Sequence, residues 1–144
     1  MAVYKFTKAL YEGRAIDVYN QGDMQRDFTY IDDIISAMMK LVDILPGKDE
    51  LSGAPYKIYN IGNNSPEKLM DLITFLEEET GITAEKNMME MQPGDVYSTY
   101  ADVDALAEVT GFRPSTSLKD GIHKFVEWYK NYYGITDQSE RKEA

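Results

Sequence analysis

The segment 24–34 limits the possible folds more than any other stretch of this chain. It places Arg26 directly before a short run of β-forming residues at 28–31, and two acids follow at Asp32 and Asp33. A carboxylate at the start of a helix meets free backbone N–H groups and the positive end of the helix dipole. The segment therefore predicts a short buried strand that leads directly into an acid-capped helix.

The remaining sequence alternates between helical and extended patterns. Apolar residues at helical spacing, with Gly or Pro at the ends, predict helices over 3–12, from Asp32 or Asp33 to about 45, from Ser65 to 80, from Asp102 to 110, and from Ser117 to 133. β-rich runs predict strands at 15–19, 28–31, 56–61 and 84–91. The predicted class is α/β, or α+β if the sheets stay small.

The length of 144 residues suits one compact domain. We expect the folded part to cover 1–134 and a polar tail to cover 135–144. The portion 28–62 has the pattern of a strand, a well-buried helix and a strand in a mostly buried sheet. Met1-Ala2 leads almost directly into a helix, a start that suits a fragment of a longer protein.

Charge and composition exclude several classes of function. The net charge is −10, whereas binding to nucleic acid or to anionic membranes usually needs a basic face. No apolar run approaches the roughly 20 residues that span a bilayer. The chain has no cysteine, so disulfides and thiolate chemistry are excluded, and a cytoplasmic location fits.

Three places carry side chains suited to binding a ligand. Arg26 could hold two phosphate oxygens, although a surface ion pair with Asp23 or Asp27 is the simpler interpretation of its spacing. The loop 92–95 could aim an amide and a carboxylate at hydroxyl groups, or it could be an ordinary turn. Tyr19 could lie flat against a base, or pack at an edge.

No catalytic group is evident in the sequence. Tyr4 and Lys8 lie one helical turn apart, a pair that arises often by chance. The single histidine, His123, lies beside the apolar stripe of the last helix and suits a surface role. No metal-ligand cluster and no pair of nucleophile and base is visible.

Taken together, these segments resemble the C-terminal half of the extended short-chain dehydrogenases, specifically the NAD-dependent nucleotide-sugar epimerases and dehydratases. The motifs that carry the resemblance occur in family order and span roughly 2–134. They are Arg26–Ile34, Tyr59–Asn63, Gln92–Val96, Ala101-Asp102, Gly111–Pro114, Gly121-Ile122 and Phe125–Tyr129. The phrases Ile16–Asn20 and Met91–Asp95 favour the branch that acts on UDP-glucuronate.

The resemblance implies a set of substrate-binding residues. Arg26 matches an arginine that contacts the diphosphate, and Asp95 matches an acid that holds the ribose. Asp17, Val18 and Tyr19 match a strand whose backbone meets uracil, with the Tyr19 ring beside the base. Two further positions are Val3, whose backbone would meet phosphate, and Gln92, which stands where UDP-galactose 4-epimerases carry an arginine.

The resemblance also implies that the catalytic machinery lies outside this chain. The family oxidises the sugar C4 with NAD, turns the 4-keto sugar over and returns the hydride to the other face. The glycine-rich loop, the Tyr base and its Lys belong to the preceding half, so we expect no catalytic residue and no bound NAD here. The expected ligand is a UDP-sugar, UDP-glucuronate or UDP-galacturonate, and the exposed half-sheet should favour self-association.

Two alternatives stay open. The parent could be a UDP-sugar decarboxylase or dehydratase of the same family. The chain could instead be a non-enzymatic module that binds nucleotide sugars or a protein partner.

Overall fold

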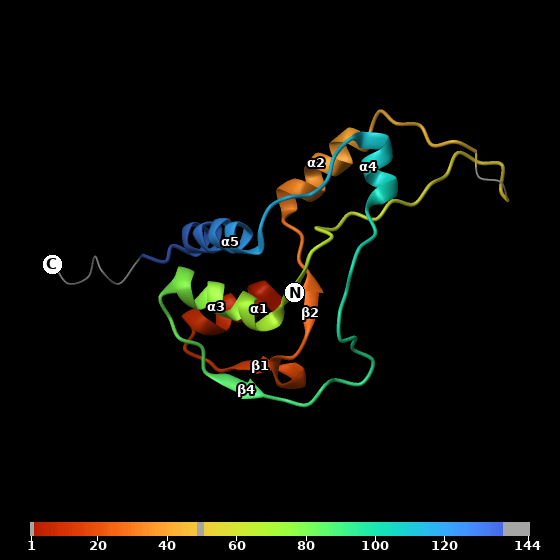
Figure 1. The fold of residues 1–144 in the computed structure, drawn as a ribbon. Coiled ribbons are helices and arrows are strands. Elements are labelled where there is room, and N and C mark those ends of the chain that lie inside the picture. Colours follow the sequence, from red (N-terminus) through yellow and green to blue (C-terminus); the bar gives the residue numbers. More distant parts are fainter. Residues whose placement is uncertain (1, 49–50, 137–144) are drawn as a thin grey trace.

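The computed structural model describes residues 2–48 and 51–136 and confirms a mixed helix-and-strand class with small sheets (Figure 1). The end of the predicted tail, 137–144, lies outside the described residues. The helices are α1 (Ala2–Tyr11), η1 (Tyr19–Gly22, a 3-10 turn), α2 (Ile31–Leu41), α3 (Leu69–Thr80), α4 (Asp104–Thr110) and α5 (Leu118–Tyr133). The strands are β1 (Ile16–Val18), β2 (Gln25–Asp27), β3 (Pro66–Lys68) and β4 (Lys86–Met88).

The strands form two separate pairs. β1 runs parallel to β4, with Asp17 opposite Asn87. β2 runs antiparallel to β3, with Arg26 opposite Glu67. Among the described residues each sheet has only two strands, so each strand keeps one edge without a neighbouring strand.

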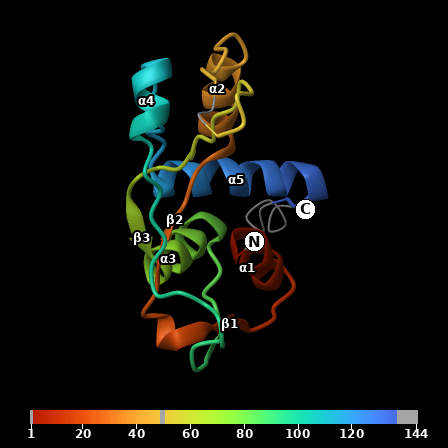
Figure 2. The same cartoon turned by 90° about the vertical axis from the view of Figure 1, so that its right-hand side faces the viewer.

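The core lies where α3 packs against α5 and α1. Leu72, Ile73 and Leu76 of α3 are almost completely buried, and Ile122 and Val126 of α5 face them. The β1–β4 pair lies on the far side of α1 and α3 from α5 (Figures 1 and 2). This packing fixes α1, β1 and β2 relative to one another, and these elements carry most of the predicted binding residues.

Helix α2 forms as predicted but is not well buried. It lies beside α4, outside the α1–α3–α5 core (Figure 1). Ala37 is fully buried, yet the large side chains of the α2 apolar surface are 49–69% exposed. This surface consists of Ile31, Ile35, Met38, Met39 and Val42. The expected burial was wrong because no described element covers this face.

The strands predicted on either side of α2 do not form in this structure. Residues 28–30 have no strand pairing, and the pairing occurs just before them, in β2. Residues 56–61 also lack pairing, and Tyr56 and Ile58 are 56% and 69% exposed. A β-forming sequence needs a neighbouring strand to satisfy its backbone, and the described residues provide none here.

The predicted helix starts were partly right. Ser117 caps α5 as expected, and its Oγ accepts the N–H of Asp120 at 3.1 Å. Ser65 does not cap α3, because 66–68 pair with β2 and the helix begins only at Leu69. α4 likewise begins at Asp104 after Val103, although the Asp102 carboxylate accepts the Asp104 N–H at 3.0 Å.

The acids of α2 act differently from simple caps. The helix begins at Ile31, and both Asp32 and Asp33 lie in its first turn. The Asp33 carboxylate is buried and accepts the backbone N–H groups of Ser115 and Thr116, at 3.2 and 2.9 Å. Asp33 therefore attaches α2 to the segment that leads into α5.

Asp27 joins three segments at the end of β2. Its Oδ2 accepts the N–H groups of Asn64 and Ala101, each at 3.1 Å. Gly62 lies against this contact, and a Cβ there would come within 2.3 Å of the Ala101 Cβ. A glycine is required here because any side chain would separate the segments that hold β2 in place.

Candidate functional site

A pocket of about 230 Å³ opens between α1, β1, β2 and the loop before Val96. Its polar lining consists of Lys5, Asp17, Tyr19, Arg26 and Asp95. Its apolar lining consists of Ala2, Phe6, Met24, Phe28 and Leu69. The fold thus brings Asp17, Tyr19, Arg26 and Asp95, all predicted from the sequence, to a single pocket.

Arg26 is held rigidly at one side of this pocket. Its Nη2 lies 2.7 Å from Oδ1 of Asp95, and its Nη1 donates to the carbonyls of Gln25 and Tyr97 at 2.7 and 3.1 Å. The ion pair is with Asp95, and neither Asp23 nor Asp27 is its partner. The three contacts use three of the five guanidinium N–H groups, so two stay available to a ligand.

Asp95 is positioned by its own loop. Its backbone N–H donates to the Gln92 carbonyl at 3.1 Å, and its Oδ1 accepts the Val96 N–H at 2.8 Å. The predicted turn at 92–95 is therefore present. It places Asp95 in the pocket but leaves Gln92 exposed and outside the pocket lining.

Strand β1 presents an open backbone edge. The Ile16 N–H donates to Glu85, and the Val18 carbonyl accepts from Met89, so both residues face β4. Backbone groups of successive strand residues point to opposite edges, and those of Asp17 therefore point to the edge that carries no described strand. Asp17 can thus offer one donor and one acceptor to a planar ligand.

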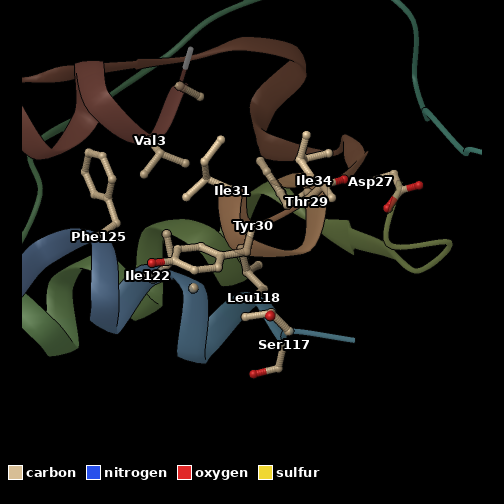
Figure 3. A pocket seen from close by; sticks show the side chains of 14 residues that line it. Val3, Asp27, Thr29, Tyr30, Ile31, Ile34, Ser117, Leu118, Ile122 and Phe125 are labelled. Atoms are coloured by element: carbon tan, nitrogen blue, oxygen red, sulfur yellow. The ribbon is translucent and has the colours of Figure 1, made fainter. Parts of the chain in front are cut away.

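Besides Gln92, two more of the predicted residues lie outside this pocket. The Val18 side chain is completely buried in the core, whereas Asp17 before it and Tyr19 after it line the pocket. Val3 lines a second, larger and mostly apolar pocket of about 380 Å³. Figure 3 shows Val3 of α1, Tyr30 and Ile31 at the start of α2, and Phe125 of α5 gathered around this second pocket.

The electrostatics near Arg26 involve one further contact. The Tyr97 hydroxyl donates to Oδ1 of Asp23 at 2.9 Å, and this hydrogen bond to a carboxylate raises the pKa of Tyr97. Tyr97 stays protonated at neutral pH and ties its own loop to η1 and β2. The carbonyl of the same residue accepts from Arg26.

Lys5, Phe6 and Phe28 belong to the pocket but were not predicted from the sequence. Ala2, Lys5 and Phe6 share one face of α1, at helical spacing. That periodicity could have suggested a shared face. Nothing in the pattern indicated that this face would meet β1 and β2.

Comparison with known proteins shows which family and which relatives this chain resembles. The model of the NAD dependent epimerase/dehydratase family matches residues 2–62. An uncharacterised 37.6 kDa protein of Escherichia coli O111:H- is 53% identical, with 94% of this chain and 43% of that protein covered. A probable UDP-glucuronate 4-epimerase of Rhizobium meliloti is 41% identical over 92% of this chain and 42% of its own length.

The fold has a close match among solved structures. A UDP-glucuronic acid 4-epimerase of Bacillus cereus, solved with UDP-glucuronic acid and NAD, superposes with a TM-score of 0.78 at 28% identity. The match covers 92% of this chain and 40% of that protein. The chain thus spans about two fifths of the length of the relatives that it matches.

The fold of this chain therefore matches part of a Rossmann-type epimerase structure. Residues 2–62 match the NAD dependent epimerase/dehydratase family, and the proteins similar to almost the whole chain include UDP-glucuronate 4-epimerases.

The described residues do not fit NAD. A dinucleotide site needs a parallel strand that leads through a glycine-rich turn to a helix N-terminus. Among the described residues, the only two strands that pair in parallel, β1 and β4, lead into η1 and into the loop after Met88, where no such turn and helix follow. Within the same residues, no group of three acidic, His or Cys side chains could hold a metal, and no helix is long and apolar enough to cross a membrane.

Proposed function

We propose that this chain is the substrate-binding, C-terminal portion of an NAD-dependent UDP-sugar epimerase. UDP-glucuronate 4-epimerase is the specific activity that we assign to the complete protein, through a 4-keto intermediate. The observation that carries the proposal is the pocket that places Arg26 and Asp95 beside the open edge of β1. Relatives that carry this activity in their names match almost the whole chain.

The pocket geometry supports a specific placement of the ligand. The two remaining N–H groups of Arg26 suit the oxygens of a diphosphate. The open edge at Asp17, with the Tyr19 ring beside it, suits uracil, whose edge carries both donors and acceptors. Asp95 can accept a hydrogen bond from a ribose hydroxyl without losing Arg26. The backbone contacts proposed for Val3 and Val18 and the contact proposed for Gln92 stay predictions, because Val3 and Gln92 lie outside this pocket and Val18 faces β4.

We assign the chemical step to the rest of the parent protein. NAD would supply hydride transfer there, while the residues of this chain bind and orient the UDP-sugar. The parent enzyme acts in the cytoplasm in this proposal. The chain alone, given NAD and UDP-glucuronate, should show no epimerisation, and measurable turnover would contradict this division of labour.

We also propose that the α2 apolar surface makes the chain self-associate. Segment 28–62 would complete a larger sheet in the parent, with 28–31 and 56–61 becoming strands. In this chain the helix of that segment exposes five large apolar side chains. A second copy could cover them, because both copies carry the same unpartnered face.

Binding of UDP tests the proposed site. Millimolar UDP, followed by NMR chemical shifts, should perturb residues around the pocket, and Arg26→Ala should weaken the affinity at least about tenfold because a charged diphosphate contact is lost. Arg113→Ala is the matched control. Arg113 is an exposed arginine paired with Asp104 at 2.7 Å, and it lies outside the pocket lining.

Two outcomes of this experiment would contradict different parts of the proposal. Equal affinities for the wild type and Arg26→Ala would remove Arg26 from the site. Absence of any UDP-dependent shift in the wild-type chain would overturn the assignment of this portion as the UDP-binding one.

A further inference from the structure

The charge of the pocket depends on Lys5, which pairs with no carboxylate among the described residues. The lining contains two cations, Lys5 and Arg26, and two carboxylates, Asp17 and Asp95. Arg26 is already paired with Asp95 at 2.7 Å. Within residues 2–48 and 51–136, no carboxylate lies within ion-pair distance of Lys5.

The position of Lys5 on α1 is fixed by helix geometry. Lys5 lies one turn after Ala2 and next to Phe6, and all three line the pocket. Thr7, Ala9 and Leu10 of the same helix are buried. Lys5 therefore cannot rotate away with the helix unless the core packing is disrupted, and only its flexible side chain can move.

We propose that Lys5 is the second cationic contact for the phosphate groups of a nucleotide ligand in this pocket. The proposal rests on the proposed function and deepens it by naming a second group, besides Arg26, that discriminates a nucleotide from a nucleoside. Gln92 carries no charge and lies outside the pocket lining, so it cannot take this role in the structure. With Lys5 removed, the lining would carry one cation against two carboxylates in a chain of net charge −10.

An anion entering such a pocket would meet net repulsion, because Arg26 is largely compensated by Asp95. With Lys5 present, the four charges balance, and the incoming phosphate meets an ammonium group with three free donors. Lys5 should therefore affect binding of charged nucleotides and leave binding of the uncharged base and ribose unchanged.

The test compares UDP with uridine on the 144-residue chain. Lys5→Met should weaken UDP binding about tenfold and leave uridine binding unchanged, whereas Lys5→Arg should retain most of the UDP affinity. The salt dependence of UDP binding should also fall in Lys5→Met, because one fewer charge contact is made. Lys8→Met is the matched control, since Lys8 lies on the same helix, pairs with Glu12 at 3.7 Å and is absent from the pocket lining.

Unchanged UDP affinity in Lys5→Met would overturn the role of Lys5 while leaving the proposed function intact. Equal losses for UDP and uridine would also overturn it, since they would indicate a distorted pocket rather than a lost phosphate contact. Failure of the wild-type chain to bind UDP at all would overturn the proposed function, and the role of Lys5 with it.

Discussion

Single residues join the elements of this chain through backbone amides. Asp33 is the clearest example, because its buried carboxylate accepts two N–H groups from the segment before α5. The Asp27 carboxylate likewise accepts the backbone N–H groups of Asn64 and Ala101, at the end of the strand that carries Arg26. These carboxylates hold loop segments that are not paired in a sheet. The pocket depends on the positions of those loops.

Removal of the Asp33 carboxylate should destabilise the chain. Asp33→Ala leaves two part-buried N–H groups without their acceptor, which we expect to cost about 2–4 kcal/mol. Urea denaturation followed by circular dichroism measures the change. The neighbouring Asp32→Ala is the control, because Asp32 is 68% exposed and its nearest cation, Lys124, lies 4.0 Å away; its cost should stay below about 1 kcal/mol. Equal effects of the two substitutions would exclude a special role for Asp33.

At the scale of elements, the contact between α3 and α5 carries a pH-dependent link. Nδ1 of His123 lies 2.8 Å from Oε2 of Glu79. This hydrogen bond is the main cause of the raised pKa of His123. The nearby charges of Glu79, Glu127 and Asp120 act in the same direction, and desolvation by burial acts against them. His123 lies on the surface, as expected from its place beside the apolar stripe, and its partner is on another helix.

The sign of the pH effect follows from the direction of the shift. A histidine whose folded pKa is raised stabilises the fold fully below its unfolded pKa of about 6.5 and loses that contribution as pH rises through the folded value. Titration of the imidazole protons by NMR is unambiguous, because His123 is the only histidine. Glu79→Gln should lower the pKa of His123, and the urea midpoint should then depend less on pH in this range. An unchanged His123 pKa in Glu79→Gln would contradict the assigned pair.

At the scale of the whole molecule, a buried core and an uncovered helix coexist in one short chain. The α1–α3–α5 core is well formed, while the α2 apolar surface and the segment around Ile58 contact solvent. The chain spans about two fifths of the length of its relatives, and apolar surface of this extent is common where a partner normally packs.

Self-association should therefore depend on α2. Ile35→Lys combined with Met39→Lys places charges on two exposed positions one turn apart and should shift the chain towards monomer in light scattering, because the apolar contact between copies is lost. Tyr132→Lys is the control, since Tyr132 is 68% exposed on α5, away from the α2 apolar surface. A wild-type chain that stays monomeric at high concentration would rule out the proposed association.

The helices, the turn at 92–95 and Arg26 as a binding candidate could all be predicted from the sequence. These features depend on local chemistry, such as the Ser117 cap, helical spacing and loop residues, and local chemistry is visible in a single sequence. The strands that form depend on the tertiary structure. The β-forming segment 56–61 stays unpaired because strand formation needs a neighbour, and the neighbour is a property of the whole fold. The tertiary structure also decided that Arg26 pairs with Asp95, remote in sequence, and that Lys5 enters the same pocket, because packing of α1 against distant segments brings them together.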